Sequence, residues 1–246
     1  GATGFYLPYH GHNDRALQEQ LARVYAAACP SLQFHAAHCD EPPPRQGDRP
    51  LRIGFVSYFL RRHTIAKLWG DVMTRLDRKR FHVTLFSLSP TEDAETARLE
   101  AGVDQFVHLP RSLAVARDAI ADAKLDLIYY TDIGMEPLTY FLAFARLARV
   151  QCVTWGHPQT TGISTVDYFI SSALCEPEDG EAHYSEQLAR LPVMGNWIRR
   201  PQLPEAISRD VLGLPTSAHL YGCLQSVFKL QPDFDVIFGD ILRRDD

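Results

Sequence analysis

The chain has little lysine and no excess of positive charge. Four of its 246 residues are lysines, and its formal net charge is −5. Proteins that bind nucleic acid or acidic membranes through their charge usually present a basic face. This balance therefore argues against general nucleic-acid binding and against attachment to a membrane surface.

Long apolar runs and paired cysteine motifs are also missing. No run approaches the roughly 20 residues of a membrane-spanning helix, and the first residues do not resemble a signal peptide. The five cysteines form no C-x-x-C pair. Cys152 and Cys223 lie within apolar runs, so we expect both to be reduced and buried. These features predict a cytoplasmic protein without membrane contact.

The common signatures of nucleotide, metal and hydrolase sites are absent as well. The sequence contains no G-x-x-x-x-G-K-S/T loop and no G-x-G-x-x-G after a strand. It also lacks H-E-x-x-H, a cluster of Cys and His, and G-x-S-x-G. We therefore expect no metal site and no cofactor, and these motifs leave the function open.

What the chain does contain is a regular alternation of strands and helices. Hydrophobic residues make up 46% and charged residues 22%, enough to bury a sizeable core. Strands that alternate with helices of this length indicate βαβ units, and hence an α/β fold with a Rossmann-like, doubly wound parallel sheet. The predicted strands are 51–57, 81–87, 105–109, 125–130, 150–155 and 167–171, and the predicted helices are 64–78, 91–101, 112–123 and 136–147.

A helix and a linker precede this alternation, and a short unit follows it. Residues 14–28 carry Leu17, Leu21, Val24 and Tyr25 at the spacing of an amphipathic helix. Four prolines within 39–50 indicate an extended linker. Near the end, 218–224 is strand-like and 232–244 helical, one βα step of another sheet. We predict four parts: 1–38 with a helix packed on the lobe that follows, 39–50 as linker, 51–200 as a Rossmann-like lobe, and 201–246 as the start of a second lobe.

Four polar loops carry candidate site residues. His10 precedes a glycine, His63 follows the first strand, the loop 155–162 follows the fifth strand, and Lys229 lies between a strand and a helix. Loops that follow parallel strands emerge at one edge of the sheet, where such folds bind ligands. Each residue also has a plainer interpretation, as a hydrogen-bonding loop histidine, a tight turn or a solvated cation.

The order of these loops resembles that of a known family. The loop 155–162 reads Trp-Gly-His-Pro-Gln-Thr-Thr-Gly, and Val166-Asp-Tyr-Phe-Ile and Tyr184-Ser-Glu-Gln-Leu follow it. From about Phe5 to the last residue, the chain resembles the catalytic region of the O-GlcNAc transferases, the SPINDLY-like family 41 of glycosyltransferases, and their bacterial relatives. The resemblance implies GT-B architecture, with two facing Rossmann-like lobes. This chain then holds the first, catalytic lobe (51–200) and only the beginning of the second, nucleotide-sugar-binding lobe (201–246). It also implies an inverting, metal-independent transfer of a sugar, in the first place GlcNAc, from a UDP-sugar to a protein Ser or Thr.

The resemblance assigns roles to single residues. His10 and His63 match the two active-site histidines of the family, and Lys229 matches the lysine that holds the diphosphate of the nucleotide. A histidine can orient or deprotonate an acceptor, and a lysine can stabilise a leaving diphosphate without a metal. The residues expected to bind substrate are Gly156, His157, Pro158, Thr160, Thr161, Gly162 and Gln225.

The match departs from the family pattern near His63. The family has Asp-Phe-x-x-His-Pro, whereas this chain has Phe59-Leu-Arg-Arg-His63-Thr64. The aspartate that would pair with His63 is missing, which weakens a role for His63 as a base.

Other functions remain open at this point. The form Gly-His-Pro-x-Thr-Thr also resembles bacterial N-glucosyltransferases of adhesins, which would use UDP-glucose. A degenerate scaffold that only binds a partner protein, and a transferase for lipid or small acceptors, are further alternatives. His10 and Lys229 favour a catalytic protein, although this chain alone is expected to be inactive. The expected partners are a nucleotide-sugar donor and a protein or peptide acceptor, with tetratricopeptide repeats upstream in the full-length protein.

Overall fold

The chain folds into two compact units in a computed structural model that describes residues 4–44, 47–200 and 205–245. The first unit comprises the described residues up to Pro8 and the long segment Asn13–Arg199. The second comprises Tyr9–His12 and the described residues from Arg200 on.

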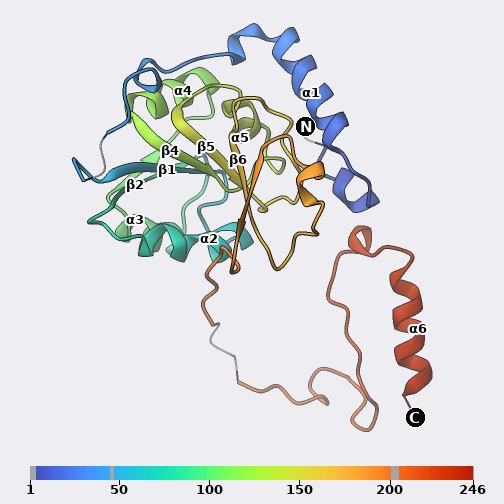
Figure 1. Cartoon of the computed structure of the whole chain (residues 1–246). Helices are drawn as coiled ribbons and strands as arrows, with labels where there is room; N and C mark the ends of the chain where they lie inside the picture. The colour runs from blue at the N-terminus through green and yellow to red at the C-terminus, as the bar shows by residue number, and fades with distance from the viewer. Residues whose placement is uncertain (1–3, 45–46, 201–204, 246) are drawn as a thin grey trace. The chain divides into compact units, whose positions relative to one another are not determined.

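A seven-stranded sheet forms the centre of the first unit (Figure 1). The strand order is β3-β2-β1-β4-β5-β6-β7, and all neighbouring strands are parallel. The order runs outward from β1 in both directions, so the predicted doubly wound, Rossmann-like sheet is confirmed. The strands are β1 (Leu51–Ser57), β2 (Phe81–Ser87), β3 (Gln105–His108), β4 (Leu125–Tyr130), β5 (Ala148–Thr154), β6 (Tyr168–Ser172) and β7 (Gln187–Leu191).

The edge strand β7 is absent from the sequence prediction, which ends the sheet with the sixth strand. Its first residue is exposed and the other four are only half-buried. A short, partly solvated edge strand has no apolar run to mark it, because its pairing with β6 depends on backbone hydrogen bonds rather than on deep burial.

Helices cover both faces of the sheet (Figure 1). One face packs against α2 (Thr64–Arg75) and α3 (Ala94–Ala101), with Trp69, Met73 and Leu99 in its core. The other packs against α4 (Leu113–Asp122) and α5 (Pro137–Leu142). No helix in the described part of the chain is both long and apolar enough to cross a membrane. Short 3-10 helices span Leu7–His10, Pro30–Leu32, Ala37–Cys39, Gly180–His183 and Val227–Lys229.

The first long helix, α1 (Arg15–Ala28), packs with only part of the predicted apolar face. Gln18 and Ala22 are buried, whereas Leu17 and Val24 are 48% and 56% exposed. The cause is a close approach of backbones, because a Cβ on Gly162 would lie 2.3 Å from the carbonyl carbon of Gln18. Leu17 and Val24 therefore point outward, whereas Leu21 is half-buried and Tyr25 packs against the core.

The helix α5 ends at Leu142, five residues earlier than the sequence predicts. Its continuation forms a parallel bridge between His35 and Arg146 instead. The Arg146 N–H donates to the Phe34 carbonyl oxygen (2.8 Å), and its own carbonyl oxygen accepts from the Ala36 N–H (2.9 Å). These long-range hydrogen bonds replace helical ones and lead the chain into β5.

The end of the proline-rich linker is fastened to the sheet. Arg49 donates two hydrogen bonds to the buried Asp126 of β4, at 2.6 and 3.0 Å. Residues 45 and 46 of the predicted linker lie outside the described residues, as do 201–204 of the predicted second lobe.

The second unit contains the predicted helix but not the predicted strand. The helix is α6 (Phe234–Arg244). Residues 218–224 are exposed and join none of the described strand pairs. A strand needs a neighbour for its backbone hydrogen bonds, and no described segment of this unit supplies one. Cys223 is therefore exposed, against prediction, whereas Cys152 in β5 is buried as expected.

Candidate functional site

Two loops meet at the carboxyl edge of the sheet. A Cβ on Gly156 would lie 1.7 Å from the carbonyl oxygen of Thr131 and 2.8 Å from Cδ1 of Ile65. Only glycine permits this approach, which joins the end of β5 to the end of β4 and to the first turn of α2. The loop 155–162 therefore lies beside the first turn of α2, to which the loop with His63 leads.

His63 occupies the N-cap position of α2. Its Nδ1 accepts a hydrogen bond from the Ile65 N–H at 3.2 Å. Its ring stacks on that of Phe59, with centroids 4.1 Å apart. A ring nitrogen that accepts a hydrogen bond carries no proton, so the neutral imidazole has its proton on Nε2. His63 can therefore offer an Nε2–H donor to a ligand.

The surroundings of His63 favour this neutral form. Burial lowers its pKa, and the positive charges of Arg61 and Lys67 lower it further. With Nδ1 occupied and Nε2 protonated, the ring has no free lone pair with which to accept a proton. The geometry thus supports an orienting role rather than that of a base.

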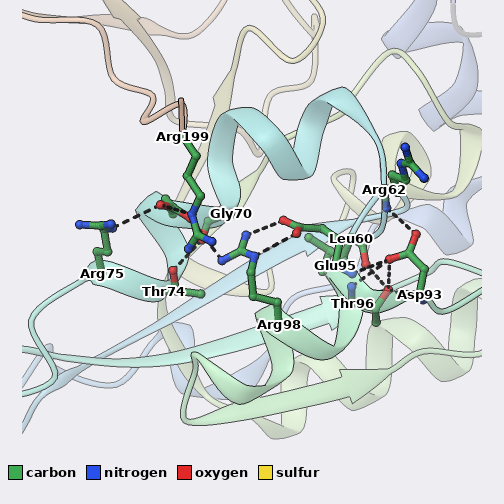
Figure 2. A network of polar contacts seen from close by, with 11 residues as sticks. Leu60, Arg62, Gly70, Thr74, Arg75, Asp93, Glu95, Thr96, Arg98 and Arg199 are labelled. Atoms are coloured by element: carbon green, nitrogen blue, oxygen red, sulfur yellow. Dashed lines mark hydrogen bonds and ion pairs between the residues drawn. The ribbon is translucent and has the colours of Figure 1, made fainter. Parts of the chain in front are cut away.

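The loop before α2 is held by the start of α3 (Figure 2). The Arg62 N–H donates to Oδ2 of Asp93 at 2.7 Å, and the Thr96 hydroxyl donates to the Leu60 carbonyl oxygen at 2.9 Å. Asp93 also caps α3, because it accepts from two backbone N–H groups of the first turn. These bonds fix the backbone that leads to His63.

The threonines of the loop 155–162 are bonded inside the protein. The Thr160 hydroxyl donates to Oε2 of Glu186 at 2.6 Å. Thr161 donates to Oε1 of Glu186 through its N–H, at 2.8 Å, and through its hydroxyl. All three side chains are buried. Both threonines therefore tie the loop to the segment before β7 instead of facing a ligand.

The other predicted substrate-binding residues of this loop differ in access. His157 is 2% exposed, and its Nε2 lies 2.9 Å from the Phe5 carbonyl oxygen. Burial lowers the pKa of His157. Pro158 is exposed, and Gly156 and Gly162 are half-buried. A ligand can therefore reach the loop mainly at these three positions.

The second unit brings the segments of His10 and Lys229 together. Nζ of Lys229 lies 5.8 Å from the ring centroid of Tyr9, and the rings of Tyr9 and Phe228 meet at 5.1 Å. His10 is exposed, and so is Gln225, whose Oε1 accepts from the next backbone N–H. These three predicted site residues belong to the second unit, and the others belong to the first.

Two of the predicted site residues offer groups that suit an anionic ligand. They are the Nε2–H of His63 in the first unit and the ammonium of Lys229 in the second. Such donors stabilise negative charge on a phosphate oxygen. Across the part of the chain that the structure describes, no group of three or more His, Cys, Asp or Glu side chains could hold a metal ion.

The carboxylates that shape the first unit's loops are missing from the sequence prediction. Asp132 stands two residues after the fourth strand, so the rule that selected the other loops could have found it. Asp93 stands three residues before Thr96, a pattern typical of a helix start. Glu186 belongs to the Tyr-Ser-Glu motif. Their partners are distant in sequence, and no spacing rule connects them.

The fold and the residues at its carboxyl edge define a Rossmann-like lobe of the kind that enzymes use for nucleotide ligands. The chain belongs to glycosyltransferase family 41, because the sequence model of "Glycosyl transferase family 41" matches residues 16–198. This match includes His63 and the loop 155–162.

Relatives whose descriptions name an activity support this membership. The chain is 24% identical to the "Probable UDP-N-acetylglucosamine--peptide N-acetylglucosaminyltransferase SEC" of Arabidopsis thaliana, over 94% of this chain and 25% of that protein. It is 33% identical to the protein of the same description called SPINDLY from Oryza sativa subsp. japonica, over 65% of this chain and 18% of that protein. A mutant O-GlcNAc transferase of Thermobaculum terrenum has a similar structure, with a TM-score of 0.66, 25% identity, and coverage of 79% of this chain and 38% of that one. The chain thus spans a quarter or less of the curated relatives.

Proposed function

We propose that the complete protein carrying this chain is an inverting, metal-independent glycosyltransferase that moves GlcNAc from a UDP-sugar to Ser or Thr side chains of proteins. The observation that carries the proposal is His63. It lies inside the region matched by family 41, at the carboxyl edge of the sheet, and it is held with a hydrogen-bond donor available. The names of the relatives include UDP-N-acetylglucosamine and a peptide acceptor.

The proposed reaction is a single displacement at the anomeric carbon. The acceptor hydroxyl oxygen attacks from the face opposite UDP, and the bond to the β-phosphate oxygen breaks with its electron pair leaving on that oxygen. The hydroxyl proton passes to a base. Lys229 stabilises the negative charge on the diphosphate, and His63 donates its Nε2–H to an oxygen of the donor. His10 orients or deprotonates the acceptor.

The organisation of the complete protein is part of the same proposal. The lobe 51–200 would face a second lobe that begins near 201, with the linker 39–50 and the helix of 1–38 supporting the first lobe. We expect tetratricopeptide repeats upstream to present the protein acceptor, and a cytoplasmic location. Of the predicted substrate-binding residues in the loop 155–162, Gly156, Pro158 and Gly162 are the ones that a substrate could reach.

A second candidate is an N-glucosyltransferase that uses UDP-glucose. It rests on the Gly-His-Pro form of the loop, in which His157 is buried against the Phe5 carbonyl oxygen. Incubating the complete protein with UDP-N-acetylglucosamine and UDP-glucose side by side, followed by mass spectrometry of acceptor proteins, separates the candidates. We expect a HexNAc on Ser or Thr. A hexose on Asn would support the second candidate. If the protein neither transfers nor hydrolyses either donor, it is a scaffold that only binds a partner protein.

A further inference from the structure

Asp132 is a buried carboxyl group at the centre of the carboxyl edge. It follows β4 by two residues and is fully buried. Its Oδ2 accepts hydrogen bonds from the Tyr58 N–H at 2.8 Å and from the Ser57 hydroxyl at 3.2 Å. Asp132 therefore holds the residues at which β1 ends and the His63 loop begins.

A chain of contacts leads from this carboxyl group to the imidazole of His63. The Ser57 oxygen, which donates to Asp132, also accepts from the Phe59 N–H at 3.0 Å. The Phe59 ring then stacks on His63, with 21° between the ring planes. The Ser57 hydroxyl makes both bonds at once, because it has one proton to donate to Asp132 and a lone pair left to accept from the Phe59 N–H.

The other carboxyl oxygen of Asp132, Oδ1, is not satisfied by the described residues. Oδ1 is buried and has no hydrogen-bond partner among the described residues. An unsatisfied buried carboxyl oxygen costs stability. Such costs concentrate at functional sites, where a residue is retained for something other than stability. Because Asp132 has no solvent access, it cannot touch a substrate and must act through its neighbours.

We propose that Asp132 is a positioning residue for His63, which it orients through Ser57 and Phe59. This inference rests on the proposed function only in giving His63 a catalytic purpose. The bonds from Asp93 and Thr96 hold the distal half of the loop, and Asp132 holds its stem. The two supports together fix the direction of the His63 Nε2–H.

Nuclear magnetic resonance of the His63 ring in this chain tests the proposal without any activity. The ring signals are assigned by comparison with His63→Gln. In Asp132→Ala, we expect the His63 ring protons to lose the shift caused by stacking on Phe59 and the Nε2–H tautomer to lose its dominance. Asp132→Asn retains an acceptor oxygen and should largely restore both signals.

Two further variants complete the test. Ser57→Ala breaks the same chain one step later and should change the His63 signals as Asp132→Ala does, so the proposal stays testable if Asp132→Ala does not fold. Asp104→Ala removes a carboxylate that accepts from the Val83 N–H at 2.7 Å, outside this chain of contacts, and should leave His63 unchanged. Unchanged His63 signals in folded Ser57→Ala or Asp132→Ala would overturn the proposal. If the signals change but the complete protein transfers no sugar, the proposed function fails and the positioning role remains.

Discussion

At the scale of single residues, the site contains groups that lower the stability of the fold, and Asp132 is the clearest case. Burial raises the pKa of Asp132 to about 7 from 3.8, and the negative charge of Glu136 adds to the rise, against the hydrogen bonds from Tyr58 and Ser57. The folded protein therefore keeps the carboxyl proton up to about pH 7, whereas the unfolded chain loses it above about pH 4. Because the folded state binds more protons in this window, stability falls as the pH rises through it.

Asp132→Asn should remove this pH dependence. The amide stays neutral, so the difference in free energy of unfolding between Asn and Asp should grow in favour of Asn from pH 4 to pH 7 and then level off. The growth should be about 2 to 4 kcal/mol, given about 1.4 kcal/mol for each pKa unit. Urea unfolding of both proteins at several pH values measures it. A difference that does not change with pH would show that Asp132 ionises normally in the fold.

Gly162 should be essential for the contact between α1 and the lobe. Its φ is +70° and its Cβ would meet the Gln18 backbone at 2.3 Å, so Gly162→Ala should lower the free energy of unfolding by about 3 kcal/mol or more. Gly47→Ala is the matched control, since Gly47 also has a positive φ, +96°, but nothing within 4 Å. Its loss should be about 1 kcal/mol. Thermal or urea unfolding measures both losses. If the two variants lose the same free energy of unfolding, the close approach of Gly162 to the Gln18 backbone does not affect stability.

At this scale, the sequence identifies the residues of the site but not their protonation or burial. The position of His63 follows from the resemblance and from the loop after the first strand. Its neutral, Nε2-protonated form depends on Arg61, Lys67 and the Ile65 N–H in the folded chain. The burial of Thr160 and Thr161 on Glu186 likewise needs a contact across 25 or more residues.

At the scale of elements, α2 connects the candidate site to the end of the first unit. His63 caps its start, and Asp71, farther along, is 3% exposed in its side chain and pairs with Arg75, Arg98 and Arg199 (Figure 2). Arg199 is the last residue of the first unit. The Trp197 N–H also donates to the Leu68 carbonyl oxygen at 3.2 Å. The chain therefore leaves the first unit while bound along α2.

Asp71→Ala should release this segment. We expect faster trypsin cleavage after Arg199 and a loss of about 1 to 3 kcal/mol in the free energy of unfolding, because Arg75 and Arg199 are more than half exposed and solvent screens them. Limited proteolysis followed by mass spectrometry locates the cleavage. Asp240→Ala removes an exposed partner of Arg243 in α6 and serves as control. Cleavage at Arg199 at the same rate in both variants would contradict this role of Asp71.

The sequence predicts those elements that bury apolar residues at a clear period. β1, β2 and β4 fall at or within a residue of their expected ranges because each lies in the core. The edge strand β7 and the early end of α5 depend on pairing with distant backbone, which no local pattern reports. The exposure of Leu17 and Val24 on α1 has the same kind of cause, since the glycine that α1 approaches lies at 162.

At the scale of the whole molecule, the predicted site residues are divided between two units of unequal packing. The first unit has a continuous core on both faces of its sheet, whereas α6 has no buried residue. In the second unit, Gln225 and Lys229 are exposed. A single exposed cation attracts a diphosphate only weakly in water.

The isolated chain should therefore bind UDP weakly. Titration calorimetry with UDP and UDP-N-acetylglucosamine should show no binding in the low-micromolar range, with or without Lys229→Ala. Low-micromolar affinity that survives this substitution would show that the donor site lies in the first lobe. It would contradict the assignment of nucleotide-sugar binding to the second lobe.

The most direct test of the account is the turnover of UDP-N-acetylglucosamine by the complete protein with Lys229→Ala. Removal of a group that stabilises the negative charge growing on the diphosphate in the transition state should lower turnover roughly a hundredfold or more. Lys79→Ala, which removes an exposed lysine of the first unit, should leave it unchanged. Unchanged turnover in Lys229→Ala would make Lys229 a surface cation and contradict the account of this chain as part of a UDP-sugar-dependent transferase site.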